Sequence, residues 1–155
     1  MQICQASKPE DIALARVLFE EYAAWLALDL SFQGFEDELA ELPGLYAPPR
    51  GCLLLALSGA QGAGCVALRP LTIDVCEMKR LFVRSAFRGR GLGRLLAERV
   101  LQEARLIGYT AMKLDTLPVM QEAIRLYEAL GFVRCPAYYQ TPLKGTIFME
   151  LQLWR

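Results

Sequence analysis

A segment rich in glycine and arginine carries the clearest chemical signal in the sequence. From Arg88 to Arg94, three glycines alternate with charged or apolar residues, and an amphipathic stretch follows. Consecutive amides at a helix N-terminus carry partial positive charge and bind anions. Glycine removes the Cβ atoms that would keep a phosphate away from the backbone, and arginine adds full charges. The spacing predicts a diphosphate site on the first helical turn, built from Arg88, Gly89, Arg90, Gly91, Leu92, Gly93 and Arg94.

Two well-known phosphate loops do not fit this segment. A P-loop needs Gly-Lys-Ser/Thr, which the sequence lacks. A dinucleotide fingerprint needs glycine at the sixth position of G-x-G-x-x-G, but counting from Gly89 gives Arg94 and counting from Gly91 gives Leu96. A nucleic-acid patch fits poorly as well, because the whole chain carries 17 basic and 17 acidic residues. We therefore expect a compact phosphate ligand and no nucleic-acid partner.

The spacing that does fit is Arg88-x-x-Gly91-x-Gly93. It resembles the acyl-CoA pyrophosphate motif of the Gcn5-related N-acetyltransferase (GNAT) superfamily, Gln/Arg-x-x-Gly-x-Gly/Ala. A second segment, residues 123–132, reads Ala-Ile-Arg-Leu-Tyr-Glu-Ala-Leu-Gly-Phe and is similar to the family's A-I-x-L-Y-x-x-x-G-F. The order of the surrounding elements matches the family too, so the resemblance implies one N-acetyltransferase domain over residues 1–155.

The resemblance implies acetyl-CoA as the acyl donor and no metal. Backbone groups of residues 81–83 would bind the pantetheine arm as an added strand would, and residues 88–94 would wrap the pyrophosphate. The strand at 81–83 would splay from the strand at 112–116 to leave a slot for the cofactor. Many members carry an asparagine where this sequence has Met120, and Thr116 or nearby backbone groups would replace it. Beyond the pyrophosphate loop, the implied cofactor-binding residues are Leu81, Phe82, Val83 and Thr116.

The resemblance also points to two catalytic residues. Tyr127 would lie near the thioester sulfur and protonate the departing thiolate, because a phenol with a reference pKa of about 10 stays protonated at neutral pH. Glu77 is the candidate general base for the amine, at an offset that some members share. It precedes Val83 by six residues, so strand alternation places both on one face. Tyr127 could instead be a core tyrosine, Glu77 could be a structural partner of a nearby cation, and an ordered water could be the base.

The acceptor is the least determined partner. The resemblance implies direct attack by a primary amine in a ternary complex, and the acidic first half of the chain favours a small cationic molecule over a protein amine. Four acids would either attract it or form a solvated helix face, and three tyrosines would either line its pocket or serve as ordinary packing. The alternative function is a catalytically weak CoA-binding sensor or interaction module. The four acids are Glu36, Asp37, Glu38 and Glu41, and the three tyrosines are Tyr46, Tyr138 and Tyr139.

The composition narrows the chemistry further. The 155 residues include no histidine, which excludes Ser-His and Cys-His nucleophiles and removes the commonest zinc ligand. The five cysteines are odd in number and have no C-x-x-C spacing, so we expect reduced, buried thiols in a cytoplasmic protein. No apolar run reaches the roughly 18 residues that span a bilayer, and no leader is evident, so we expect no membrane partner.

Charge is divided unevenly along the chain. Residues 1–77 carry four basic and eleven acidic side chains, whereas residues 78–155 carry thirteen basic and six acidic ones. Six cations fall within 17 residues with no acid between them, which predicts an anion-binding patch in the second half. They are Lys79, Arg80, Arg84, Arg88, Arg90 and Arg94.

Hydrophobic periodicity predicts the elements that position these groups. An edge strand at 1–5 precedes a helix capped by Ser7, with Glu10 completing a capping box. A short helix follows near 35–42, then strands at 51–58, 65–71 and 75–83, with a turn at 59–64. The second half alternates: helix 91–107, strand 111–116, helix 120–130 with a Schellman end at Gly131, and closing strands at 132–138 and 147–154.

This order predicts a single α/β domain with helices on both faces of one mixed sheet. The resemblance adds that the sheet is mostly antiparallel, with six or seven strands, one parallel splayed pair and about four flanking helices. Homodimers are common in the family, and nothing in the sequence sets the oligomeric state.

Overall fold

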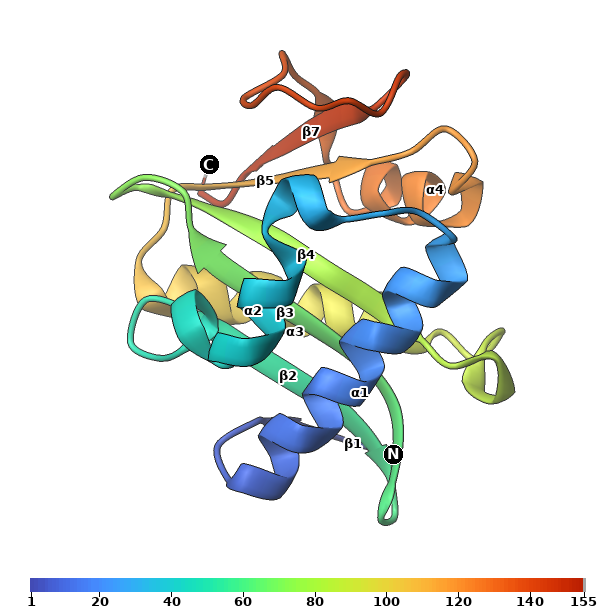
Figure 1. The fold of residues 1–155 in the computed structure, drawn as a ribbon. Coiled ribbons are helices and arrows are strands. Elements are labelled where there is room, and N and C mark those ends of the chain that lie inside the picture. The colour runs from blue at the N-terminus through green and yellow to red at the C-terminus, as the bar shows by residue number, and fades with distance from the viewer. Residues whose placement is uncertain (155) are drawn as a thin grey trace.

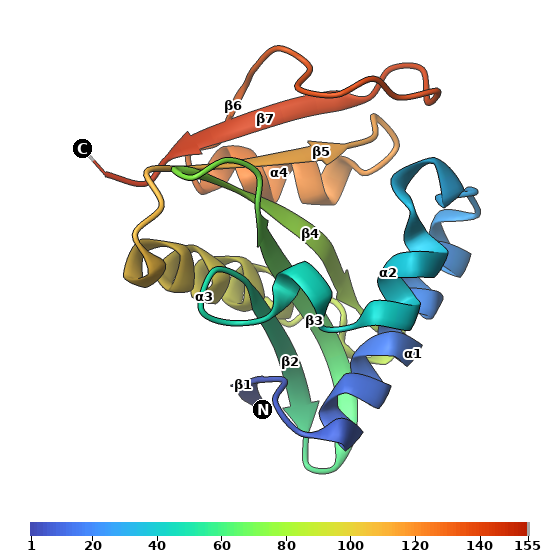
Figure 2. The same cartoon turned by 60° about the vertical axis from the view of Figure 1, so that its left-hand side comes forward.

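The computed structural model describes residues 1–154, which fold around one seven-stranded sheet. Helices α1 and α2 cover one face, and α3 and α4 cover the other (Figures 1 and 2). The expected α/β class is confirmed, and no helix in this range is long and apolar enough to cross a membrane. The helices are α1 (Pro9–Leu26), α2 (Phe35–Glu41), α3 (Leu92–Ile107) and α4 (Gln121–Ala129). The strands are β1 (Gln2–Gln5), β2 (Cys52–Ser58), β3 (Gln61–Pro70), β4 (Val75–Val83), β5 (Ala111–Thr116), β6 (Val133–Arg134) and β7 (Ile147–Gln152).

The sheet opens between its two parallel strands. The strand order is β1-β2-β3-β4-β5-β7-β6, and every neighbouring pair is antiparallel except β4 and β5. Those two strands pair at only three positions, the last being Glu77 with Lys113. Beyond that point they diverge, as Figure 2 shows. The predicted splay is therefore present, although residues 112 and 113 still belong to the paired part.

A β-bulge changes the face that β4 presents. The β3–β4 register shifts between Cys65 and Ala67, and Arg80 on β4 has a left-handed φ of 62°. An extra residue in one strand reverses the alternation beyond it. The prediction that Glu77 and Val83 share a face is therefore wrong: Glu77 faces α1 and α2, and Val83 packs on the side of α3.

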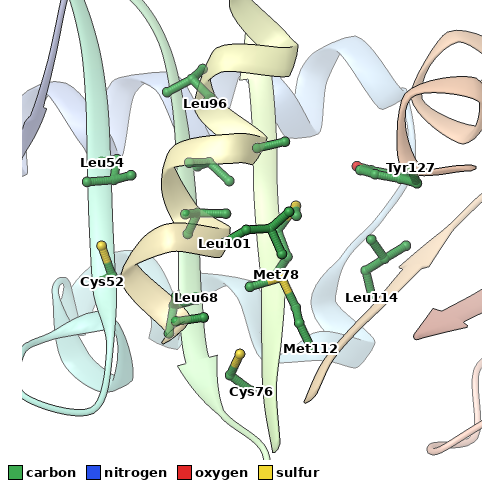
Figure 3. Packing of buried hydrophobic residues seen from close by; sticks show 14 of the residues in the cluster. Cys52, Leu54, Leu68, Cys76, Met78, Leu96, Leu101, Met112, Leu114 and Tyr127 are labelled. Atoms are coloured by element: carbon green, nitrogen blue, oxygen red, sulfur yellow. The ribbon is translucent and has the colours of Figure 1, made fainter. Parts of the chain in front are cut away.

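Two apolar layers hold the sheet between its helices. The layer under α3 and α4 includes Leu54, Leu96 and Tyr127 (Figure 3). The layer under α1 and α2 includes Phe19 and Leu53. Because both faces are covered, the central strand β2 is apolar without alternation, as its sequence predicted.

The ends of the helices decide where site residues sit. Helix α3 begins after Gly91 (φ 75°) and ends at Gly108 (φ 110°). Helix α4 ends in the predicted Schellman motif: the Phe132 amide donates to the carbonyl of Tyr127 at 3.0 Å, and Gly131 has a φ of 104°. The start of α1 differs from prediction, because the Asp11 carboxylate, not Ser7 or Glu10, accepts the backbone amides of residues 7 and 8 at 3.2 Å.

Two predicted boundaries in the sheet are wrong. The predicted turn at 59–64 is only two residues long, because β3 already begins at Gln61 and Gly62 and Gly64 lie inside it. Those glycines allow close packing and do not form the turn. The predicted strand at 132–138 is reduced to Val133–Arg134, and the rest is a loop that carries Tyr138 and Tyr139 back over Phe148 on β7.

We predict that Gly64→Ala destabilises the protein more than Gly62→Ala. A Cβ at position 64 would lie 2.5 Å from the backbone oxygen of Phe82, which cannot move freely, whereas at position 62 it would lie 2.9 Å from the flexible end of Leu14. Urea denaturation should give losses of about 3 and about 1 kcal/mol in the free energy of unfolding. Equal losses would contradict this account of β3.

Candidate active site

A groove of about 1050 Å³ runs from the end of β4, past the start of α3, to the start of α4. Nine of the eleven residues predicted to bind cofactor line it. Thr116 lines an adjoining cavity, and Arg90 lies outside both, with its guanidinium 5.9 Å from the ring centroid of Phe87. The nine are Leu81, Phe82, Val83, Arg88, Gly89, Gly91, Leu92, Gly93 and Arg94.

The glycine loop has the shape that a diphosphate needs. Gly89 and Gly91 have φ values of 78° and 75°, which only glycine adopts without strain. A Cβ at either position would meet nothing within 4 Å, so it would project into open space beside the groove. No side chain in the described part of the chain caps α3, which leaves the amides of its first turn available to an anion. The residues present therefore fit the diphosphate of acetyl-CoA.

The arginines around the loop are held differently from one another. The Nε of Arg88 donates to the Val83 carbonyl at 2.8 Å, and its guanidinium lies 4.7 Å from the ring centroid of Trp25. Arg94 forms only a loose ion pair with Glu98 at 3.6 Å and is half exposed. Among the further groove residues that sequence reasoning missed, Trp25 and Lys144 belong to neither motif, and Arg125 stands at the variable position of the second motif.

The free edge of β4 fits the pantetheine arm. Beyond Glu77, β4 pairs with β3 on one side and with no strand of the described chain on the other. An extended amide chain in the groove could bond to the free backbone groups on that side as a strand does, except that the Val83 carbonyl already accepts the Nε of Arg88. Leu81 and Val83 lie along this edge, as predicted.

A small cavity of about 50 Å³ lies at the opening between β4 and β5. It joins the large groove, since residues such as Leu81, Leu117 and Met120 line both. Tyr127 reaches it from α4, and Lys79 and Asp115 reach it from the two diverging strands. The cavity is therefore where the end of a ligand in the groove would meet polar side chains from the opposite face.

Tyr127 has the environment of a proton donor. Its side chain is buried and lines the cavity. Burial raises the pKa of Tyr127 far above its usual value, and the nearby Tyr22 and Asp115 raise it further. The phenol therefore stays protonated near neutral pH and has its O–H available to a group in the cavity.

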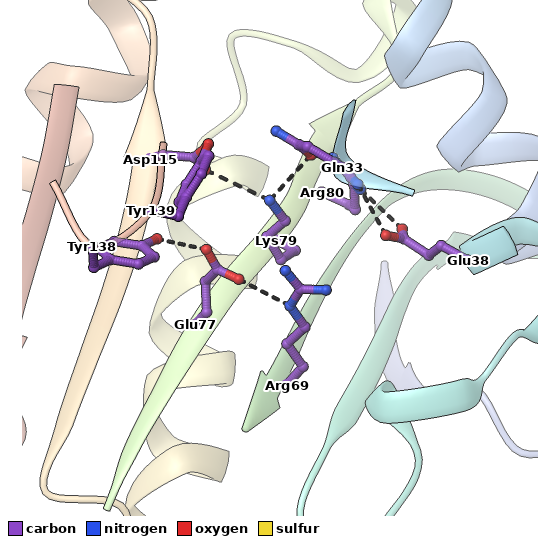
Figure 4. Close-up of polar contacts among 9 residues, drawn as sticks. All are labelled: Gln33, Glu38, Arg69, Glu77, Lys79, Arg80, Asp115, Tyr138 and Tyr139. Atoms are coloured by element: carbon purple, nitrogen blue, oxygen red, sulfur yellow. Dashed lines mark hydrogen bonds and ion pairs between the residues drawn. The ribbon is translucent and has the colours of Figure 1, made fainter. Parts of the chain in front are cut away.

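Glu77 is fully engaged with two protein partners. It is 1% exposed; one oxygen accepts the Arg69 Nε at 2.9 Å and the other accepts the Tyr138 hydroxyl at 2.5 Å (Figure 4). The structural partner considered from sequence is thus present, and it is Arg69. Glu77 does not line the cavity, so any proton it takes must reach it through Tyr138 or through water.

A second polar chain lies beside the first (Figure 4). The Nζ of Lys79 donates to Oε1 of Gln33 at 3.2 Å and lies 3.7 Å from Oδ1 of Asp115. The other oxygen of Asp115, Oδ2, accepts the Tyr139 hydroxyl. Arg80 binds both oxygens of Glu38, at 2.9 and 3.0 Å. From the sequence, Tyr138 and Tyr139 could either pack in the core or line the acceptor pocket. In the structure each hydroxyl donates to a carboxylate, that of Glu77 and that of Asp115 respectively.

The predicted anion-binding patch is only partly available. Lys79 and Arg80 are buried and paired with acids, and Arg84 binds Glu21 through two hydrogen bonds. Arg80 and Arg84 of the second half therefore each pair with an acid of the first half. The acids expected to attract a cation are divided likewise, because Glu38 is occupied by Arg80 and the remaining three are exposed.

Three of the five cysteines are too buried to offer a nucleophile, whereas Cys4 and Cys135 are partly exposed. Cys52, Cys65 and Cys76 are buried, and all five thiols are free. Burial raises the pKa of Cys52 and of Cys76 to about 12. Neither thiol is a thiolate near neutral pH, which fits the expectation of inert, buried sulfur.

A sheet opened between two parallel strands, with a glycine loop beside the opening, defines the class of an acyl-CoA-binding α/β protein. The model of the acetyltransferase (GNAT) family matches residues 15–132. An N-acetyltransferase of Schizosaccharomyces pombe is 38% identical, over 99% of this chain and 95% of its own. An N-acetylaspartate synthetase of Danio rerio is 34% identical, over 72% and 43%. An acetyltransferase of Salmonella typhimurium, solved with its cofactor acetyl-CoA, has a TM-score of 0.72 at 23% identity, over 100% and 95%. The chain belongs to the acetyltransferase (GNAT) family and is by class an acyl-CoA-dependent N-acetyltransferase.

We predict that Gly91→Glu abolishes micromolar binding of acetyl-CoA, whereas Gly108→Glu does not. Both glycines flank α3 with positive φ and open space around a Cβ, so the backbone strain is comparable. Only position 91 puts a carboxylate beside the diphosphate, where repulsion of up to a few kcal/mol weakens binding by about 100-fold. Calorimetric titration measures the affinity of both variants for acetyl-CoA. Equal affinities would contradict the assignment of the diphosphate to this loop.

Proposed function

We propose that the protein transfers the acetyl group of acetyl-CoA to a primary amine of a small molecule, by direct attack in a ternary complex. The observation that carries the proposal is the junction between groove and cavity at the opening of β4 and β5. The groove fits the cofactor, and the cavity brings Tyr127 and polar side chains of the opposite face to its end. An acyl group and an amine can therefore meet without a covalent enzyme intermediate.

Residues of this chain would hold the donor along its length. The first-turn amides of α3, with Gly89, Gly91 and Arg94, would bind the diphosphate. The edge of β4 at Leu81–Val83 would bind the pantetheine amides, and its amides would also stabilise the oxyanion formed as the amine attacks. Thr116 lines the cavity next to Met120, which supports its role in place of the family's asparagine.

Two proton transfers complete the reaction. The amine nitrogen bonds to the acetyl carbon and loses a proton, the carbon–sulfur bond breaks, and the sulfur gains a proton. Tyr127 is the proposed donor to sulfur, because its hydroxyl stays protonated and its side chain lines the cavity. Glu77 is the proposed acceptor from the amine, with the Tyr138 hydroxyl or a water between them. An ordered water held by backbone carbonyls is the competing assignment for the base.

The size of the cavity supports a small acceptor. About 50 Å³ admits an amine and a few further atoms, while a larger body would have to stay outside. The name of the Danio rerio relative, N-acetylaspartate synthetase, gives an acetylated small molecule as its product. Both observations favour a small-molecule amine over a protein amine.

We predict that Tyr127→Phe lowers kcat by about 100-fold and leaves the KM for acetyl-CoA nearly unchanged, because it removes one proton donor and little packing. Tyr109→Phe is the matched control: Tyr109 is a buried tyrosine whose hydroxyl donates to the Arg50 carbonyl, away from the groove. Acetyl transfer to an amine panel, followed by mass spectrometry, gives both constants. A fully active Tyr127→Phe would assign Tyr127 to the core, and a wild type that binds acetyl-CoA but acetylates nothing would favour a sensor.

We predict that Glu77→Gln slows acetylation by about 100-fold at pH 7, and that the loss shrinks as the pH rises towards the pKa of the amine. A neutral amine no longer needs a base, so alkaline solution replaces the missing carboxylate. Steady-state rates from pH 6 to 10 measure this recovery, with thermal melting to follow folding. A loss that stays constant across that range, with a lowered melting temperature, would make Glu77 a structural partner of Arg69 only.

A further inference from the structure

The polar cluster of Figure 4 has more hydrogen-bond donors than acceptors left over. This cluster comprises nine side chains on the face of α1 and α2, with three cations and three carboxylates. Both oxygens of each carboxylate lie against donors or cations, whereas two of the cations keep unused N–H groups. The members are Gln33, Glu38, Arg69, Glu77, Lys79, Arg80, Asp115, Tyr138 and Tyr139.

Arg80 and the three acids are closed to a ligand. Arg80 gives its hydrogen bonds to Glu38 and Gln33. Glu77 accepts from Arg69 and Tyr138, and Asp115 lies between Lys79 and Tyr139. An ammonium group entering the cluster would therefore have to displace a cation that is already in place. This argues against the cationic acceptor that the acidic first half of the chain suggested.

Lys79 has capacity to spare and faces the cavity. Its ammonium group carries three donors, and one of them bonds to Gln33 at 3.2 Å while Asp115 lies at a loose 3.7 Å. The residue is 5% exposed, so water replaces the missing partners poorly. Burial lowers the pKa of Lys79, and the charge of Asp115 only partly opposes the shift. The nearby negative charge therefore does not fully compensate for the burial of the ammonium group.

Two neighbours add further unused donors. Arg69 gives only its Nε to Glu77, and its two terminal nitrogens have no partner within residues 1–154. The hydroxyl of Tyr46 is buried without a hydrogen bond and lies among the charges of Glu38, Arg80 and Arg69. The charges of the cluster balance, so the local excess is of hydrogen-bond donors, and it lies next to the position proposed for the reacting amine.

We propose that the acceptor is an amino acid whose free carboxylate binds Lys79. This inference rests on the proposed acetyl transfer and names its substrate class. Lys79 and Tyr127 line the same 50 Å³ cavity, so the amine and the carboxylate must be close together in the acceptor. An α- or β-amino acid meets that requirement, and a polyamine does not. A carboxylate has the acceptor oxygens that the unused N–H groups lack.

The test compares amines that differ only in the carboxylate. Wild-type enzyme with saturating acetyl-CoA is given L-alanine, β-alanine and L-aspartate, the amides L-alaninamide and β-alaninamide, and spermidine, with product followed by mass spectrometry. We expect kcat/KM for L-alanine and for β-alanine to exceed that of the corresponding amide by about tenfold or more, as the loss of a charge-assisted hydrogen bond implies. This arm needs no mutant, so it does not depend on how a variant folds.

The second arm assigns the contact to Lys79. Lys79→Met should raise the KM for the preferred amino acid about tenfold or more, remove the preference over the amide, and leave the KM for acetyl-CoA unchanged. Lys113→Met is the matched control: Lys113 lies on the same face of the neighbouring strand, pairs with Glu150 at 4.0 Å and does not line the cavity. It should retain the wild-type preference.

Each contrary outcome has a distinct meaning. Equal rates for acids and amides, or a preference for spermidine, would overturn the carboxylate site while the acetyltransferase stands. A Lys79→Met enzyme that folds and keeps its preference would overturn the assignment to Lys79. Failure to acetylate any amine, with acetyl-CoA bound, would overturn the proposed function and this inference with it.

Discussion

The parallel pairing of β4 and β5 ends after three residue pairs, and the architecture of the site depends on that early ending. If the two strands stayed paired to their ends, the backbone of Leu81–Val83 would be satisfied within the sheet and there would be no edge for a ligand. A sheet can tolerate such an opening only if its unpaired groups find other partners or solvent. Here the unpaired groups lie beside the groove, where solvent can reach them and where an extended ligand could take the place of that solvent.

The bulge at Arg80 is the second half of the same arrangement. It lets β4 stay bonded to β3 while its side chains change faces partway along. Before the bulge, Glu77 and Lys79 face α1 and α2; after it, Val83 packs on the side of α3. In the proposed reaction, one strand thereby offers polar side chains to the acceptor and a backbone edge to the cofactor. Arg80 itself takes the left-handed conformation, and its two bonds to Glu38 hold it there.

Sequence reasoning succeeded where local rules decide the structure. The glycine loop, the start of α3 and the Schellman end behind Tyr127 are short-range features with characteristic residues, and these were predictable. It failed where contacts between segments far apart in the sequence determine the structure. The two-residue alternation of a regular strand predicted Glu77 and Val83 on one face, because no local residue pattern marks the bulge at Arg80. Gly62 and Gly64 suggested a turn, but in the structure their small size allows packing against Leu14 and β4.

The two halves of the site consequently have different origins in the chain. The cofactor side of the proposed site is built mainly from two contiguous motifs, residues 88–94 and 123–132, so its geometry follows from short runs of sequence. The acceptor side gathers Gln33, Arg69, Lys79, Asp115 and Tyr138 from separate elements, and only tertiary structure brings them together. Buried ion pairs of this kind add little net stability, but they orient their members and disfavour a wrongly charged guest. The acceptor side can therefore change its specificity through single substitutions while the cofactor side stays intact. For that reason, the class of reaction follows from the motifs and the choice of amine does not.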